Sequence, residues 1–447
     1  SDAVKVDATA AAQRLAWSVQ FRTVSLQTPS DAGAAEFTKL HAYLAQQYPR
    51  VHATLKREAV GLSLLYTWAG TDPQALPIAL LAHQDVVPIA SGTEQAWSVD
   101  PFAGVIKDGF VWGRGTLDDK GNILAQLEAV EMLIANGFKP KQTVYLAFGE
   151  DEELGGNRGN KALVELLKSR GVKLGFVLDE GMVITEGVFP GLSQPLALIG
   201  LAEKGGVNVH LSFDGKPGHS SMPTVPSAIG SMSKALASLE THQMPAAIKG
   251  VAGDMFGALA PEMPWLNRVL LSNLWLTGPV VQSQLEKSPA ANAMMRTTTA
   301  LTIVNGGNKA NVLPGHVDAT VNFRILPGDT VQGVHEHVRA VVANEMIKTE
   351  VPDGQEPSPV SPTASAGYQA IARTVRQLFP NVIVAPGLVI VGTDSRHYTP
   401  LTDSIYRFSP MRFRPEDLTR LHGTNERIAI SNYVEVIQFY HQLLATL

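Results

Sequence analysis

The sequence of 447 residues contains no cysteine, which excludes a disulfide framework and a zinc site built on thiolates. It contains no apolar run of about 18 residues, the length that a membrane span requires, and no block of basic residues. With 36 Lys and Arg against 41 Asp and Glu, the net charge of −5 disfavours nucleic acid as a partner. We therefore expect no membrane span and no nucleic-acid binding, and any metal must be held by His and carboxylate side chains.

The composition is that of a globular protein with a large core, since 45% of the residues are hydrophobic and 17% are charged. The length is enough for two or three domains. The first residue is Ser1 rather than Met, which fits removal of a signal peptide or a cloning remnant. We expect a soluble protein, periplasmic or secreted after removal of the signal, with the cytoplasm as the alternative. The absence of cysteine fits either compartment.

The stretch 77–122 carries the strongest local signal. Its opening apolar run is read as a buried strand that ends near His83, and Asp85, two residues later, shares the same face. A carboxylate beside a histidine can fix the tautomer of the ring and raise its basicity. The stretch closes in a glycine-rich turn with two adjacent carboxylates, Asp118 and Asp119, placed before an expected helix.

Two further expected strands also lead into acidic residues. The apolar run 143–148 precedes four consecutive acids at residues 150–153, and the run 174–178 precedes Asp179-Glu180-Gly181. Open α/β sheets bind their ligands at the C-terminal ends of the strands. Because like charges gathered at one edge need a cation, the pattern predicts a metal site there.

The motifs that carry this pattern resemble those of a known family. They are, in chain order, AHQDVVP, GRGTLDDKG, GEDEELGG and LDEG. They resemble the co-catalytic zinc peptidase family of glutamate carboxypeptidase, the aminoacylases, succinyl-diaminopimelate desuccinylase and carboxypeptidase S (Gly-X carboxypeptidase). The later motifs GKPGHSS, NVLPG, GTDSRHY and LHGTNERI are most similar to the carboxypeptidase S branch. The resemblance runs from His83 to His422, with every metal position matched.

The resemblance implies an α/β fold, with a mixed, mostly parallel sheet sandwiched by helices and an inserted α+β ferredoxin-like domain that serves as lid or dimerisation domain. The alternation of expected strands and helices through Asp179 is typical of such a sheet. We expect the catalytic domain to comprise residues 1–204 and 357–447. The lid then comprises residues 205–356, with an extra insert at 245–295.

The insert is unusually rich in Met, Trp, Leu and Phe, including Trp265 and Trp275. Two interpretations stay open. In the first, the insert is helical and packs on its own lid. In the second, it forms a wall of a pocket for an apolar acyl group.

The resemblance also implies two zinc ions per chain, with cobalt or manganese as substitutes. Asp118 is then the carboxylate that bridges the two ions. His83 and Asp179 complete one metal site, and Glu153 and His422 complete the other. A cis peptide bond between Asp118 and its successor is part of the same pattern.

Further residues receive roles by the same resemblance. Glu152 is the general base, Asp85 supports His83, and His219 stabilises the oxyanion, although a glycine-flanked loop histidine can equally be solvent-exposed. The implied substrate contacts are Asn311, Arg324 and Arg396. For Arg324 the alternative is a surface charge, and for Arg396 it is an ion pair with Asp394.

The expected function is a dinuclear metal-dependent amide hydrolase. It releases a C-terminal amino acid with a free carboxylate from short peptides or from N-acyl amino acids, as a carboxypeptidase or an aminoacylase. One alternative is an aminopeptidase on the same scaffold, which would want acids near the substrate amine rather than Arg near its carboxylate. Another is a non-catalytic metal- or peptide-binding relative, which has no need of Glu152. We expect a homodimer, in which His219 acts in the partner's site, rather than a monomer.

Overall fold

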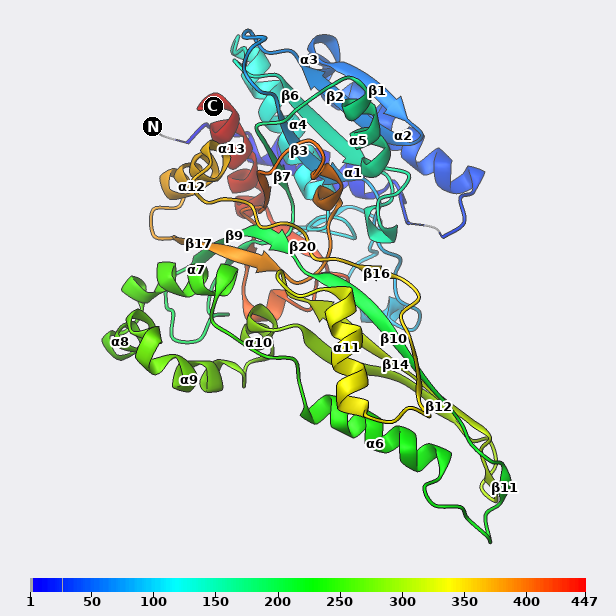
Figure 1. The fold of residues 1–447 in the computed structure, drawn as a ribbon. Coiled ribbons are helices and arrows are strands. Elements are labelled where there is room, and N and C mark those ends of the chain that lie inside the picture. Colours follow the sequence, from blue (N-terminus) through cyan, green and yellow to red (C-terminus); the bar gives the residue numbers. More distant parts are fainter. Residues whose placement is uncertain (1–2, 26) are drawn as a thin grey trace.

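The computed structural model describes residues 3–25 and 27–447, so Ser1 lies outside the described residues. Figure 1 shows a broad body built on a central sheet and a long lid that extends from it. The sheet has ten strands in the order β1-β2-β6-β3-β7-β18-β9-β8-β19, with β17 paired to β9. Their bounds are β1 (Lys56–Val60), β2 (Ser63–Trp68), β3 (Ile78–His83), β6 (Val144–Gly149), β7 (Phe176–Asp179), β8 (Ile184–Thr185), β9 (Leu196–Glu203), β17 (Ile383–Val389), β18 (Ile405–Arg407) and β19 (Arg412–Phe413).

The centre of the sheet is parallel. Strand β3 pairs in parallel with both β6 and β7, and β18 pairs in parallel with β7. The antiparallel pairs are β1 with β2, β2 with β6, and β9 with β8 and β18. All six residues of β3 are buried, as expected for a strand covered on both faces. The predicted mixed, mostly parallel sheet is confirmed.

Helices cover the central sheet. They are α1 (Ala8–Val19), α2 (Asp31–Gln47), α3 (Pro49–Thr54), α4 (Lys120–Ala135), α5 (Asn160–Ser169), α12 (Ala366–Leu378) and α13 (Ile430–Ala445). Helix α4 is almost wholly buried because α1, α3 and α13 pack around it. A small sheet of β4 (Val105–Lys107), β5 (Phe110–Trp112) and β20 (Arg427–Ala429) lies beside them. None of the helices in the described part of the chain has the length and apolarity that a membrane span requires.

The lid has its own antiparallel sheet. Its strands are β10 (Gly205–Asp214), β12 (Thr298–Gly306), β14 (His316–Ile325), β15 (Lys348–Glu350) and β16 (Gly354–Gln355). Helices α6 (Ala228–Thr241) and α11 (Val331–Val342) close a separate apolar core over this sheet. The chain order strand-helix-strand-strand-helix-strand, with the sheet order β12-β14-β10-β15, is the ferredoxin-like arrangement that the resemblance implied. At the far tip, β11 (Gly218–His219) pairs with β13 (Val312–Leu313) (Figure 1).

The insert forms four helices, α7 (Gly250–Leu259), α8 (Trp265–Ser272), α9 (Leu274–Leu285) and α10 (Pro289–Met295). Most of their buried residues, among them Met255 and Phe256, belong to the same apolar cluster as Leu196 and Ile199 of β9. Helix α7 packs on β17. The insert therefore covers the β9–β17 side of the central sheet, which contradicts the interpretation that it packs on its own lid. The lid's apolar core is already closed by α6 and α11.

Candidate metal centre

The centre lies where three parallel strands of the sheet end. Strand β3 ends at His83, β6 leads into the short 3₁₀ helix Glu152–Leu154, and β7 is followed by Glu180. Because β3 lies between β6 and β7, the C-terminal ends of all three strands meet at one edge. The fourth contribution, Asp118, comes from the turn before α4.

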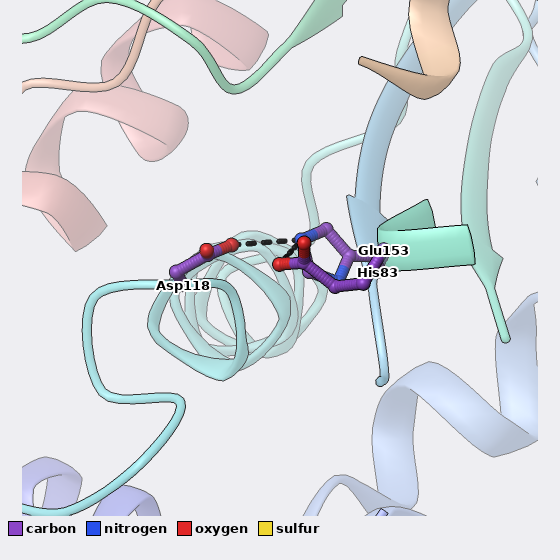
Figure 2. Close-up of side chains that lie close together, drawn as sticks. All are labelled: His83, Asp118 and Glu153. Atoms are coloured by element: carbon purple, nitrogen blue, oxygen red, sulfur yellow. Dashed lines mark hydrogen bonds and ion pairs between the residues drawn. The ribbon is translucent and has the colours of Figure 1, made fainter. Parts of the chain in front are cut away.

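Asp118 lies between two imidazoles. Its Oδ1 is 2.8 Å from His83 Nε2, and its Oδ2 is 2.7 Å from His422 Nε2. Figure 2 shows His83, Asp118 and Glu153 converging on one point. One oxygen turned to each histidine is the arrangement expected of a carboxylate that bridges two metal ions. The peptide bond between Asp118 and Asp119 is cis, as the resemblance implied.

Three more carboxylates complete the cluster. Glu180 Oε1 is 2.9 Å and Glu152 Oε2 is 3.5 Å from His83 Nε2. Glu153 Oε1 is 3.2 Å from His422 Nε2. The ligand atoms of His83, Asp118 and Glu153 all lie within 4.8 Å of one another, and so do those of His83, Glu152 and Glu180. This donor set of imidazoles and carboxylates fits zinc.

The structure brings Glu180, and not Asp179, to His83. Asp179 is absent from the groups of ligand atoms that include His83, although its carboxylate lies close enough to feel the charge of His83. Its Oδ1 accepts a hydrogen bond from the backbone N–H of Glu180, and its carboxylate feels the charges of Glu203 and Arg407. Burial raises the pKa of Asp179 to about 6, and the repulsion from Glu203 adds to the rise. Glu180 is therefore a second candidate for the position that the resemblance gives to Asp179, and the assignment of Asp179 stays a prediction.

Asp85 contacts both His83 and the backbone of the acid pair Glu152-Glu153. His83 Nδ1 lies 2.8 Å from the Asp85 carbonyl oxygen and 3.1 Å from its Oδ1, so a proton on Nδ1 leaves Nε2 with a lone pair for a metal. The two carboxylate oxygens of Asp85 also accept hydrogen bonds from the backbone N–H groups of Glu152 and Glu153, at 3.1 Å and 3.0 Å. One residue thus sets both the histidine tautomer and the position of the acid pair.

Glu426 is a functional residue that the sequence reasoning missed. Its Oε2 accepts hydrogen bonds from the backbone N–H groups of Gly115, Leu117 and Asp118, at 2.9–3.1 Å. Its Oε1 pairs with the buried Arg114 at 3.0 Å. Glu426 therefore fastens the loop that carries His422 to the turn that carries the bridging carboxylate. The sequence signal that could have identified Glu426 is its place in the motif LHGTNERI, which also contains His422.

Burial destabilises the ionised form of the carboxylates in this centre when no cation compensates their charge. Burial raises the pKa of Glu180 well above its ordinary value, and the carboxylates of Asp119 and Asp118 add to the rise. Burial also raises the pKa of Glu152, against the opposing charge of His83. A divalent cation would favour the ionised form of each group and relieve the repulsion between them.

The predicted lid residues do not reach the centre within their own chain. His219 is exposed on β11, and its Nδ1 lies 2.8 Å from Ser221 Oγ. Asn311 is also exposed, and its carbonyl oxygen accepts the backbone N–H of Ser220. Both therefore lie at the tip of the lid, far from β3 and β7 in Figure 1.

The two arginines occupy different positions. Arg396 Nη2 donates to the carbonyl oxygen of Gly155 at 2.9 Å, directly after the Glu152–Leu154 helix. It borders a polar cavity of about 250 Å³ together with Lys204. Arg324 is exposed on β14. Burial lowers the pKa of Lys204 to about 8, and the positive charge of Arg324 adds to this decrease. The alternative pairing of Arg396 with Asp394 is not observed among the described residues, since Asp394 accepts from Asn160 Nδ2.

A large apolar cavity borders Gly181, the residue after Glu180 in the chain. It measures about 590 Å³. Its walls come from the insert and from β8, β9 and β17. The insert contributes Met255, Phe256, Met263, Asn267, Leu270, Leu271, Val280, Val281, Gln284, Leu285, Ser288, Ala290, Ala291 and Met294.

The fold and the site together define a metal-dependent hydrolase. Residues 79–446 match the model of peptidase family M20/M25/M40, and the chain belongs to this family. It is an enzyme that hydrolyses peptide or amide bonds and releases amino acids, as an M20 metallopeptidase does.

Named relatives extend this assignment. The chain is 42% identical over 439 residues to a probable carboxypeptidase S-like protein 2 of Dictyostelium discoideum, covering 97% of this chain and 84% of that protein. It is 40% identical over 449 residues to the human N-fatty-acyl-amino acid synthase/hydrolase PM20D1, covering 98% of this chain and 88% of that protein.

Solved structures share the fold. An M20 family metallo-carboxypeptidase from Sulfolobus solfataricus superposes with a TM-score of 0.68 at 18% identity, over 96% of this chain and 97% of the other. Human carnosine dipeptidase 1 gives a TM-score of 0.66 at 17% identity, over 98% and 97%. The predicted architecture of an α/β catalytic domain with an inserted lid is thereby confirmed.

Proposed function

We propose that the enzyme hydrolyses N-acyl amino acids with long apolar acyl groups in preference to short peptides. The observation that carries this proposal is the apolar cavity of about 590 Å³ that borders Gly181, the residue after Glu180. A hydrocarbon chain is the ligand that matches a lining rich in Leu, Met, Val and Phe side chains. The name of the human relative, an N-fatty-acyl-amino acid synthase/hydrolase, supports the same substrate class.

We infer two zinc ions per chain, for which cobalt or manganese can substitute. Asp118 would be the carboxylate shared between them, His83 and Glu180 would hold one, and Glu153 and His422 would hold the other. Two divalent ions held by these residues would supply Lewis-acid activation of a water molecule and of the substrate carbonyl. Metal use follows from the family, whereas the number and identity of the ions rest on this donor set.

Glu152 serves as the general base. Its carboxylate reaches the edge of the ligand cluster, and Asp85 holds its backbone in place. Glu152 takes a proton from the attacking water and returns it to the leaving nitrogen of the amino acid. A group in this role contributes about 10²–10⁴-fold to the rate.

The amino acid carboxylate binds at the polar cavity. Arg396 borders this cavity beside Lys204, and Arg324 adds positive charge from the lid side. A planar guanidinium suits bidentate binding of a carboxylate. An N-acyl amino acid has one end suited to each cavity, a carboxylate for the polar one and an acyl chain for the apolar one.

We infer a homodimer in which His219 stabilises the oxyanion in the site of the partner subunit, with Asn311 beside it. The exposure of His219 at the lid tip supports this, since its own centre is far away. Strand β12 supports it as well, because it is an edge strand that exposes Leu301, Ile303 and Val304. An uncovered apolar edge strand is a surface that pairs readily with another copy.

The test uses one amino acid in several forms: N-acetyl, N-octanoyl and N-oleoyl derivatives and a dipeptide, each with a free or an amidated C-terminus. We expect kcat/KM to rise at least about tenfold from acetyl to the long chains, because each buried methylene adds favourable transfer free energy. Amidation should lower kcat/KM by a similar factor, because it removes the charge that the arginines bind. A preference for acetyl would contradict the acyl assignment, and indifference to amidation would favour an aminopeptidase.

A further inference from the structure

Helices α8 and α9 expose an apolar surface that nothing else in the described chain covers. Trp275 is 83% exposed, Trp265 71%, Leu276 67% and Val280 61%. We call these four residues, with Leu266 and Val269, the hairpin surface. Between Met263 and Leu285 only Arg268 carries a charge. Large apolar patches on a protein surface mark contacts with other proteins or with membranes.

The hairpin surface is continuous with the apolar cavity. Val280 belongs to both, because it borders the cavity and is largely exposed. On the inner side of the same helices, Leu271 and Val281 are buried and also line the cavity. Figure 1 places α8 and α9 at the outer side of the molecule, beyond α7 and α10. An apolar path therefore runs from the outer surface of the hairpin to the cavity.

We propose that the hairpin surface docks onto a zwitterionic phospholipid bilayer and that the enzyme takes its N-acyl substrate from that bilayer. This inference rests on the proposed function, because it supplies the route by which a long acyl chain reaches the cavity. Amphipathic helices lie in the bilayer interface with their apolar face buried. Trp is the residue enriched at this depth, since its ring is apolar and its N–H is polar.

The charge of the molecule selects the kind of bilayer. The net charge of −5 and the single charged residue of the hairpin, Arg268, give no basic cluster that would attract anionic lipids. Binding should therefore depend on apolar burial and change little with salt. The same scarcity of charge leaves a protein partner without charged groups to recognise.

A lipid surface also fits the cavity better than a second copy of the chain. A rigid protein face on the hairpin would close the cavity at Val280, whereas a fluid bilayer would leave it open to acyl chains. When the acyl chain of the substrate moves along a continuous apolar surface, its methylene groups stay out of water. The bilayer is thus both the docking partner and the source of the substrate.

The experiment uses the metal-loaded enzyme and vesicles of phosphatidylcholine with brominated acyl chains, which quench only tryptophans inserted among them. The sequence has six tryptophans, and the exposed ones are Trp17, Trp265 and Trp275. The test variant is Trp265→Ser/Trp275→Ser. The matched control is Trp17→Ser, which removes an exposed tryptophan from α1.

We expect quenching and vesicle co-sedimentation for the wild type and the control. Both signals should be unchanged in 0.5 M salt, which screens charge–charge attraction because the Debye length falls toward about 3 Å at 1 M. The double variant should bind vesicles at least about tenfold more weakly, because it loses two buried aromatic side chains. Its kcat/KM on vesicle-borne N-oleoyl amino acid should fall by a similar factor. Hydrolysis of dissolved N-acetyl amino acid should be the same in all three proteins.

Several results would overturn the inference: no vesicle binding by the wild type, equal binding by the double variant, or binding that salt abolishes. A change in molar mass by light scattering, confined to the double variant, would instead assign the hairpin surface to contact between copies. If the wild type hydrolyses dissolved N-octanoyl amino acids but ignores vesicles, the docking inference fails and the proposed function stands. If it binds vesicles but hydrolyses no long-chain substrate, the proposed function fails.

Discussion

At the scale of single residues, the face of a strand onto which a carboxylate projects decides whether it reaches the metal centre. Asp179 and Glu180 are neighbours at the end of β7, and both are acids. Glu180 Oε1 lies 2.9 Å from His83 Nε2, whereas Asp179 accepts a hydrogen bond from the backbone N–H of Glu180 and feels the charges of Glu203, His83 and Arg407. The two residues therefore allow a test in which charge is removed at adjacent positions.

We predict that Glu180→Ala lowers the zinc content from two ions per chain to about one, because one metal loses a carboxylate ligand. Asp179→Asn should keep both ions, since its side chain lies outside the ligand cluster. The measurement is zinc stoichiometry after dialysis, read by elemental analysis, with circular dichroism to confirm that each variant is folded. Loss of metal from Asp179→Asn with retention in Glu180→Ala would restore the sequence-based assignment.

The other metal-centre residues named from the sequence do meet in the structure, because strand ends and spacing are visible in a sequence. His83, Asp118, Glu152, Glu153 and His422 converge within one cluster. The sequence does not show which of the adjacent acids Asp179 and Glu180 lies nearer to His83. That depends on the residue at which the backbone of β7 stops being extended.

Long-range contacts to the backbone were equally invisible. Glu426 accepts a hydrogen bond from the backbone N–H of Asp118, 308 positions earlier in the chain. The motif LHGTNERI shows the acid but not the partner that it binds. The same holds for the hydrogen bonds of Asp85 to Glu152 and Glu153, which join the ends of two strands.

At the scale of elements, strong periodicity predicted most of the helices and strands. The strand expected at 143–148 is most of β6, and the strand expected at 174–178 overlaps β7. The packing of the insert could not be predicted, because two apolar cores compete for its apolar residues and only the tertiary structure decides between them. The domain boundaries near residues 204 and 356 stay predictions.

The cavity formed by the insert gives the prediction at this scale. We predict that Ala290→Trp lowers kcat/KM for an N-oleoyl amino acid at least about tenfold, because an indole ring takes the volume of several methylenes. Activity on the N-acetyl derivative should stay within about twofold. Ser283→Trp on α9 is the matched control, since Ser283 is exposed and does not border the cavity. The measurement is a chain-length series, and an equal effect of both substitutions would contradict the assignment of the cavity.

At the scale of the whole molecule, the distance between the lid tip and the metal centre bears on assembly. In a C2 dimer both subunits use the same surface at the interface. Each lid tip can then reach the site of the partner subunit. We predict that His219→Ala and Glu152→Ala, each inactive alone, recover up to about a quarter of wild-type activity when mixed under subunit exchange, on random pairing. In the mixed dimer one site combines an intact Glu152 with the partner's His219.

The readout is hydrolysis of one N-acyl amino acid, with labelled protomers to prove exchange. Confirmed exchange without recovery would mean that His219 acts within its own chain or has no part in the reaction. A protein that sediments as a monomer at assay concentration yet retains full activity would also contradict the dimer.

The link between Glu426 and the Asp118 turn has a consequence for the order in which the enzyme matures. His422 stands 304 positions after Asp118, and the whole lid is made between them. During synthesis, the pocket of His83, Asp118 and Glu180 is complete long before its neighbour. In the proposed two-ion centre, the second ion would be captured only after the loop of His422 and Glu426 has docked on the Asp118 turn. Metal uptake at that position would therefore report that this late part of the chain has reached its place.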